Sequence, residues 1–150
     1  MADLRASEID GWSPQGAVEE LSVEESWIRL GQRSEGRLGV SADNSPGIYP
    51  VDYVISERTI LFRTAEGEKL HRIRNNEHVV FEVEGDHQRR TWSVIVTGVA
   101  QELSVEPVLS PAAIDGFPPW APTAPYVYVR ITPTAVRGRQ WEAPHAIERD

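Results

Sequence analysis

Three side chains that can donate hydrogen bonds lie close together in the segment 62–70. Arg63 and Thr64 end an apolar run, Gly67 provides a turn, and Lys69 falls in the first turn of a predicted helix. A helix start has unpaired backbone N–H groups and the positive end of the helix dipole, so it attracts anions. The segment therefore predicts a phosphate-binding turn in a chain that is acidic overall.

The charge and composition exclude several classes of function. The formal net charge is -8 over 150 residues, so we expect no binding to nucleic acid or to an anionic membrane, which both need a basic surface. The absence of cysteine excludes disulfides and cysteine nucleophiles, and the histidines show no metal-ligand spacing. No apolar run has the length of a membrane span and no signal-peptide pattern is present, so we expect a soluble, cytoplasmic protein.

The elements that position the turn can be predicted from periodicity. Residues 1–20 are polar and contain Gly11, Pro14 and Gly16, so we expect a flexible arm followed by a single domain over residues 21–150. Ser22 and Glu25 form a capping-box pattern that predicts a helix over about 22–34. A second, short helix is predicted over 69–76.

Alternating apolar residues then predict an antiparallel sheet. The predicted strands are about 38–42, 49–55, 59–63, 79–83, 90–103 and 126–132. Pro50 indicates an edge position or a bulge, because proline cannot donate a hydrogen bond, and Gly85 indicates the start of a hairpin turn. Residues 104–124 contain five prolines and are predicted to be irregular. About six strands with two or three short helices predict a closed or nearly closed antiparallel β-barrel.

The order of these motifs resembles the pyridoxamine 5'-phosphate oxidase-like split-barrel flavoproteins over roughly residues 22–140. The segments that carry the resemblance are 36–40, 48–53, 60–70, 92–98, 119–120 and 137–139. The resemblance implies an antiparallel split barrel that forms a homodimer with FMN at the subunit interface. It also implies a flavin-dependent oxidoreductase that takes a small-molecule substrate and an electron donor.

The resemblance also assigns residues to the cofactor. Those beside the flavin ring would be Pro50, Val51, Asp52, Tyr53, Trp92 and Ser93, and those at the phosphate would be Arg63, Thr64 and Lys69. At the phosphate turn this chain has Gly67-Glu68-Lys69, whereas oxidases of pyridoxamine phosphate have Ser-Arg-Lys. We therefore do not expect pyridoxamine phosphate itself to be the substrate.

The residues alone leave several alternatives open. Without the resemblance, the residues favour solvated surface charges for Arg63 and Lys69. They likewise favour barrel packing for Tyr49, Tyr53 and Trp92. A flavin enzyme needs no obligatory side-chain acid or base, so no catalytic residue can be named, although Tyr49, Tyr53 and Asp52 are candidate proton donors.

Other cofactors and roles also fit the pattern. The resemblance leaves alternatives open, because relatives of this fold use FAD or a deazaflavin. A non-enzymatic flavin- or haem-binding module is a further alternative, with His71 or Tyr53 as the candidate haem ligand. The segment 104–124 is a candidate lid, with Trp120 as the residue best suited to cover an aromatic ring.

Overall fold

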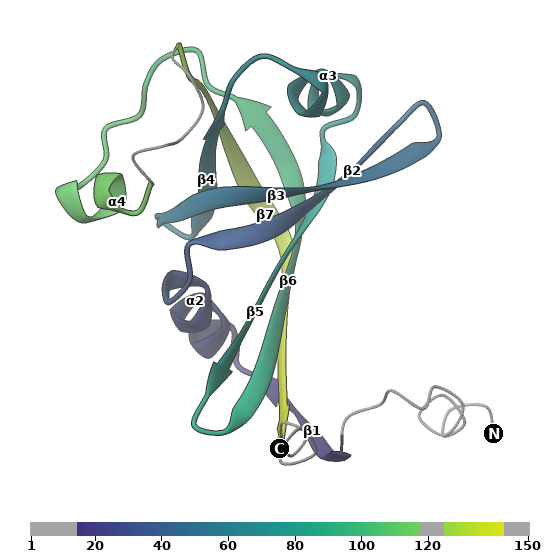
Figure 1. The fold of residues 1–150 in the computed structure, drawn as a ribbon, viewed down its shortest axis with the longest axis vertical. Coiled ribbons are helices and arrows are strands. Elements are labelled where there is room, and N and C mark those ends of the chain that lie inside the picture. The colour runs from purple at the N-terminus through teal and green to yellow at the C-terminus, as the bar shows by residue number, and fades with distance from the viewer. Residues whose placement is uncertain (1–14, 118–124, 143–150) are drawn as a thin grey trace, which may run out of the picture.

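The computed structural model describes residues 15–117 and 125–142, whose arrangement Figure 1 shows. Over these ranges the chain forms seven strands and three helices. In chain order they are β1 (Gln15–Leu21), α2 (Val23–Gly31), β2 (Glu35–Ala42), β3 (Ser45–Ser56), β4 (Thr59–Thr64), α3 (Glu68–Asn75), β5 (His78–His87), β6 (Arg90–Glu102), α4 (Pro111–Asp115) and β7 (Val127–Glu142).

All seven strands belong to one antiparallel sheet that closes on itself. Its strand order is β1-β7-β4-β3-β2-β5-β6, and β6 also pairs with β7. Six strands therefore form a ring, and β1 pairs with residues 138–142 of β7, beyond the part of β7 that pairs with β4. This confirms the predicted fold class, a mainly β, antiparallel split barrel with short helices.

The N-terminal arm differs from the prediction at its described end. Residues 15–20 belong to β1, which pairs with residues 138–142 of β7. The prediction ended the last strand at residue 132, so it missed the part of β7 that offers β1 a partner. Residues 1–14 of the predicted arm lie outside the described residues.

Three hairpins are closed by two-residue turns in which both central residues have positive φ. This is the turn geometry that matches the right-handed twist of paired strands. The turn predicted at Gly85 is therefore wrong, because β5 continues to His87 and residues 88–89 make the turn. These turns carry no glycine, which is why the sequence signals them weakly. The turn residues are Asp43 and Asn44, Glu57 and Arg58, and Gln88 and Arg89.

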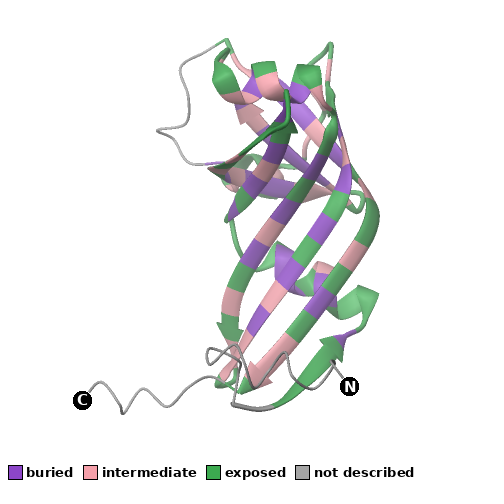
Figure 2. Cartoon of the chain, turned by 90° about the vertical axis from the view of Figure 1, so that its right-hand side faces the viewer, coloured by how far each residue is buried: buried purple, intermediate pink, exposed green. Residues whose placement is uncertain are grey.

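Two hydrophobic clusters lie on opposite faces of the barrel wall. The main cluster fills the barrel, and its fully buried members include Leu38, Tyr53, Phe62, Phe81 and Trp92. Figure 2 shows the resulting alternation of buried and exposed residues along the strands. The helix α2 begins with the predicted capping box, and α3 packs against β2. None of the three helices in the described ranges is long and apolar enough to cross a membrane.

The smaller cluster lies outside the barrel, beneath the segment 103–117. It consists of Val54, Leu61 and Phe117, with Leu103 and Leu109 packed against it. Ser110 caps α4 by accepting a hydrogen bond from the Ala113 N–H. The described part of the predicted lid is therefore packed on the barrel wall. Trp120 lies outside the described residues.

Candidate functional site

One edge of β3 is unpaired over residues 45–52, two thirds of the length of the strand. Residues 45–52 pair with β2, but pairing with β4 begins only at Tyr53. The Tyr53 N–H donates to the Ser34 carbonyl oxygen at 3.0 Å on the β2 side. Because backbone groups of alternate residues point to opposite sides of a strand, those of Pro50 and Asp52 face the open edge. Pro50 thus has its missing N–H where no partner strand lies, as predicted for an edge position.

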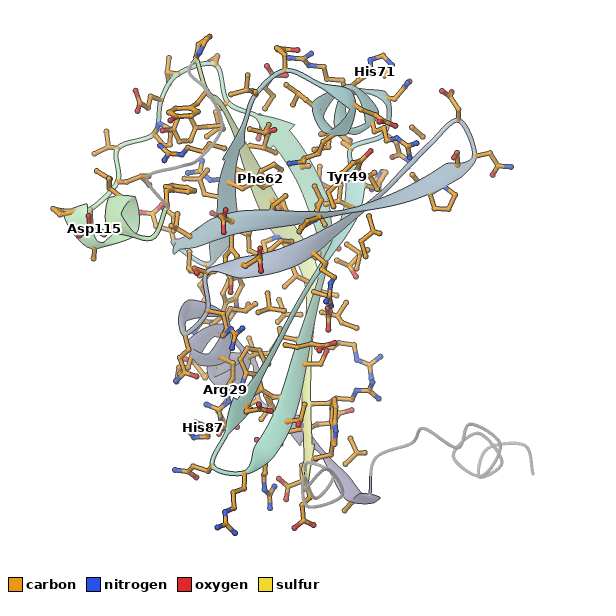
Figure 3. All side chains as sticks on the ribbon, in the orientation of Figure 1. Arg29, Tyr49, Phe62, His71, His87 and Asp115 are labelled. Carbon is orange, nitrogen blue, oxygen red and sulfur yellow. The ribbon has the colours of Figure 1, made fainter. Side chains whose placement is uncertain are left out.

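Lys69 of α3 lies beside this open edge. Its ammonium is 5.9 Å from the ring centroid of Tyr49, whose side chain lies beneath α3 in Figure 3. Burial lowers the pKa of Lys69, and the charge of Asp52 partly offsets that shift. Burial likewise raises the pKa of Asp52, an effect that Glu35 reinforces and Lys69 opposes. We call Pro50, Asp52 and Lys69 the β3-edge site.

The start of α3 is open to a ligand. Gly67 makes no side-chain cap bond, and a Cβ added to it would meet nothing within 4 Å. Glu66 and Glu68, the acids at this turn, are paired with Arg74 at 2.8 Å and Arg72 at 3.2 Å. Their charges are thereby partly neutralised, and the N–H groups of the first turn can donate hydrogen bonds to an anion.

The structure does not assemble the three-residue phosphate cradle. Arg63 and Thr64 are successive residues of β4, so their side chains point to opposite faces. Thr64 is buried, and its hydroxyl donates to the Ala65 carbonyl oxygen at 3.1 Å. The guanidinium of Arg63 lies between two aromatic rings, 4.6 Å from the centroid of Phe117 and 4.2 Å from that of Tyr126. Only Lys69 lies at the open edge.

Three residues predicted to line the flavin ring have their side chains in the core. Val51, Tyr53 and Trp92 are 5%, 1% and 1% exposed. The Tyr53 hydroxyl donates to the carbonyl oxygen of Leu30, and the indole ring of Trp92 covers Gly85. Only the backbone of these residues can be offered to a ligand outside the barrel. Of the three candidate proton donors, Asp52 and Tyr49 are half-buried and remain, whereas Tyr53 does not.

Ser93 lies on the outer surface but away from the β3-edge site. Its hydroxyl donates to Glu82 at 3.1 Å, and Glu82 lies 3.6 Å from Arg37, which is the register partner of Pro50. Ser93 is thus three strands from β3, or roughly 14 Å. Within one chain it cannot contact the same ring edge as Asp52.

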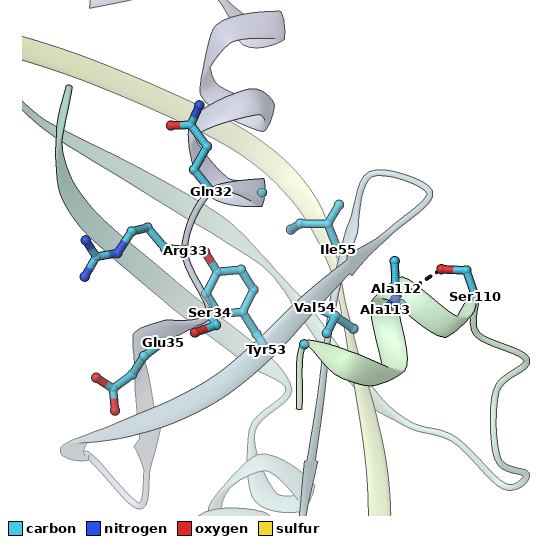
Figure 4. A pocket seen from close by; sticks show the side chains of 12 residues that line it. Gln32, Arg33, Ser34, Glu35, Tyr53, Val54, Ile55, Ser110, Ala112 and Ala113 are labelled. Carbon is cyan, nitrogen blue, oxygen red and sulfur yellow. Dashed lines mark hydrogen bonds between the residues drawn. The ribbon is translucent and has the colours of Figure 1, made fainter. Parts of the chain in front are cut away.

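A cleft of about 740 Å³ adjoins this region. We call it the α4 cleft, and Figure 4 shows its side chains. A smaller cleft of about 250 Å³ shares Arg33 and Glu35 with it and includes Pro50, which connects the α4 cleft to the β3-edge site. The residues that line the α4 cleft are Gly31, Gln32, Arg33, Ser34, Glu35, Tyr53, Val54, Ile55, Ser110, Ala112, Ala113 and Gly116.

Sequence reasoning did not identify the α4 cleft. Its two walls come from residues 31–35 and 110–116, which are far apart in the chain. The polar run 32–35 between a predicted helix and a predicted strand was the only signal. A cleft formed by distant segments cannot be read from local patterns.

The closed antiparallel sheet, with an open strand edge beside the start of α3, has the architecture of a split barrel. The chain belongs to the pyridoxamine 5'-phosphate oxidase family, whose model matches residues 22–140.

Three solved structures are similar to this chain over most of its length. A Corynebacterium glutamicum protein described as a pyridoxamine 5'-phosphate oxidase is 34% identical, with a TM-score of 0.70. The match covers 85% of this chain and 100% of that one. An FAD-binding protein of Mycobacterium smegmatis is 34% identical, with a TM-score of 0.63 and coverage of 84% and 100%. An FAD-binding protein of Mesorhizobium loti is 28% identical, with a TM-score of 0.69 and coverage of 85% and 98%.

Proposed function

We propose that the protein binds a flavin nucleotide at the β3-edge site and acts as a flavin-dependent oxidoreductase on a small molecule. FMN is the first candidate. The observation that carries the proposal is the unpaired edge of β3 at Pro50 and Asp52, with Lys69 and the uncapped start of α3 beside it.

The residues at this edge fit the chemical groups of a flavin. The ring of a flavin has a polar edge of carbonyl oxygens and an N–H, which pairs with backbone groups such as those of Asp52. The exposed ring of Pro50 offers an apolar contact. Lys69 and the start of α3 suit a phosphate. When bound, the flavin would supply the electron transfer, and the protein would supply position and electrostatics.

FAD is the second candidate. Two similar proteins are FAD-binding, and the phosphate turn provides one cation at the site, since Arg63 lies elsewhere. Chromatography of the flavin released by heat from the purified protein separates the two candidates, because FMN and FAD elute differently.

The haem-binding alternative has less support from the site. Tyr53 directs its hydroxyl to Leu30 inside the protein, so it cannot reach a ligand outside. His71, the other candidate, is exposed on α3 (Figure 3).

We also propose a homodimer formed through the outer face of β2, β3 and β5. Ile48 and Val80 are 66% and 40% exposed and both are register partners of Gly39, so they form a short apolar row. A second copy would bury that row and bring its own residues to the site. Sedimentation equilibrium should give a dimer at micromolar concentration, and a stable monomer would contradict this part of the proposal.

Turnover distinguishes an enzyme from a carrier. The flavin-loaded protein should be reduced by a nicotinamide or another donor and reoxidised by an acceptor over many cycles. Reduction no faster than that of free flavin would favour a carrier. A purified protein that shows no flavin absorption and binds neither FMN nor FAD would overturn the proposal.

A further inference from the structure

We infer that the α4 cleft is a binding site for an uncharged, flat molecule with an apolar body and one polar edge. On the proposed function this molecule is the substrate, and that identification rests on the flavin being bound at the β3-edge site. The binding property itself rests on the cleft alone. Its volume of about 740 Å³ is within the range of small-molecule sites.

The two walls of the cleft differ in polarity. One wall is apolar and consists of Val54, Ile55, Ala112 and Ala113. The other is the turn between α2 and β2, which presents Gln32, Arg33, Ser34 and Glu35. Figure 4 shows Arg33 and Glu35 on one side of the Tyr53 ring and the Val54 and α4 side chains on the other. A molecule that fills the cleft must therefore have an apolar face and a polar edge.

The apolar wall is held in place by the capping and packing of α4. Ser110 accepts a hydrogen bond from the Ala113 N–H at 3.2 Å, and a Cβ added to Gly116 would lie 2.7 Å from Val54. Ala113 packs against the outer cluster that contains Phe117. Because α4 is capped and packed, the cleft is preformed, which lowers the entropy cost of binding.

The charges at the cleft favour an uncharged ligand. Arg33 and Glu35 are the charged residues of the lining and have opposite formal charges, so the lining has no net formal charge. The C-terminal end of α2 at Gly31 adds the negative end of a helix dipole, and the whole chain carries a net charge of -8. An anion therefore gains nothing overall, whereas hydrogen bonds from Ser34 and Gln32 remain available to a neutral polar edge.

The position of the cleft links it to the proposed function. Arg33 and Glu35 line both clefts, and the smaller cleft contains Pro50 of the β3-edge site. Glu35 is also the register partner of Asp52. A molecule in the α4 cleft would thus lie next to a ring held at the open edge of β3, without occupying the place of that ring.

Two related fluorescent probes test the inference on the flavin-free protein. N-phenyl-1-naphthylamine is uncharged, and 1-anilinonaphthalene-8-sulfonate has the same aromatic body with one negative charge. The uncharged probe should bind with about three- to tenfold higher affinity, as expected for ~1 kcal/mol of repulsion at a surface site. Equal binding, or tighter binding of the sulfonate, would overturn the assignment of an uncharged ligand.

A pair of variants on α4 locates the probe. Ala112 lines the cleft and is exposed, whereas Ile114 is 54% exposed on the same helix and is not among the lining residues. Ala112→Trp should weaken both probes by about tenfold or more, because the indole fills the contact surface. Ile114→Trp should leave both affinities unchanged. Equal effects of the two variants would place the probes elsewhere and overturn the inference.

A second pair tests the charge argument. Glu35→Gln should raise the affinity for the sulfonate by about threefold and leave the uncharged probe unaffected. Glu77→Gln, which changes an exposed acid outside the cleft, should change neither affinity. A sulfonate affinity that does not respond to Glu35→Gln would contradict the electrostatic explanation.

The flavin content of the same variants distinguishes this inference from the proposed function. Ala112→Trp should bind FMN or FAD as the wild type does and melt at the same temperature. Loss of probe binding with retained flavin supports the cleft as a separate site. Loss of both probe and flavin binding without a change in melting temperature would instead place the flavin in the α4 cleft and overturn the assignment of this cleft to a separate molecule.

Discussion

Lys69 and Arg63 provide a matched test of where a flavin phosphate binds. Both were predicted to hold the phosphate, but the structure places only Lys69 at the open edge of β3 and stacks Arg63 between Phe117 and Tyr126. We therefore predict that Lys69→Met weakens FMN binding and that Arg63→Met does not. Methionine keeps an unbranched apolar stem in both variants and removes the charge.

The size of the effect follows from the single cation. A hydrogen bond between charged partners contributes about 1.5–3 kcal/mol, which corresponds to roughly a 10- to 150-fold change in affinity. Lys69 is partly buried, so solvent screens its charge less than that of a surface lysine. Because Asp52 also interacts with that charge, we expect the loss of FMN affinity to lie near the lower end of this range, about 10- to 30-fold.

Riboflavin is the control ligand, because it has the ring but no phosphate. Titration of each apo-variant with FMN and with riboflavin, followed by quenching of flavin fluorescence, gives the required affinities. Lys69→Met should remove most of the preference for FMN and leave riboflavin affinity unchanged. An equal loss of affinity for FMN and for riboflavin would mean that Lys69 supports the fold or contacts the flavin ring, and does not bind the phosphate.

Arg63→Met should lower the stability of the protein and leave its preference for FMN over riboflavin unchanged. Two cation–π contacts, together about 1–2 kcal/mol, should be lost, so the melting temperature should fall by roughly 2–8 °C for a domain of this size. The FMN preference should remain as in the wild type. A selective loss of FMN affinity in Arg63→Met would support the predicted phosphate site of Arg63, Thr64 and Lys69. It would refute the placement of the phosphate beside Lys69 alone.

Three further predictions concern stability. Asp52→Asn should raise the free energy of unfolding at neutral pH, since the raised pKa of Asp52 means that its ionised form is disfavoured in the folded state. In denaturant titrations at several pH values, this gain should vanish below about pH 4, where Asp52 is protonated in both states. Tyr53→Phe should cost about 1–2 kcal/mol, because the buried Leu30 carbonyl loses its side-chain partner, and an unchanged denaturation midpoint would contradict that bond. Gly98→Ala should destabilise the protein, since the new Cβ would collide with a backbone carbonyl of β7, whereas Gly31→Ala, with open space around it, should melt at or above the wild-type temperature.

Much of the fold could be predicted because its signals are local. The capping box at Ser22, the alternation along β3 and β6, and the proline at position 50 each follow from neighbouring residues. The C-terminal half of β7 was missed because its side chains alternate weakly between buried and exposed. Its role becomes clear only when β1 and β6 pair with it.

The candidate site was predictable only in part, for physical reasons. Lys69 follows from a helix start and Pro50 from a strand edge, whereas Asp52 was assigned through the family resemblance. The separation of the Arg63 side chain from that of Thr64 follows from the two-residue period of β4, which the prediction did not apply to these two residues. The stacking of Arg63 on Phe117 and the joining of residues 31–35 to α4 depend on contacts across the chain. No local pattern specifies such contacts.

A crystal structure of the protein with FMN would show directly whether the flavin binds at the β3-edge site. We predict that the ring lies along the open edge of β3 at Pro50 and Asp52, with the phosphate at the start of α3 beside Lys69. We also predict that the α4 cleft is left free. A flavin in the α4 cleft, or a phosphate bound by Arg63, would contradict the proposed site.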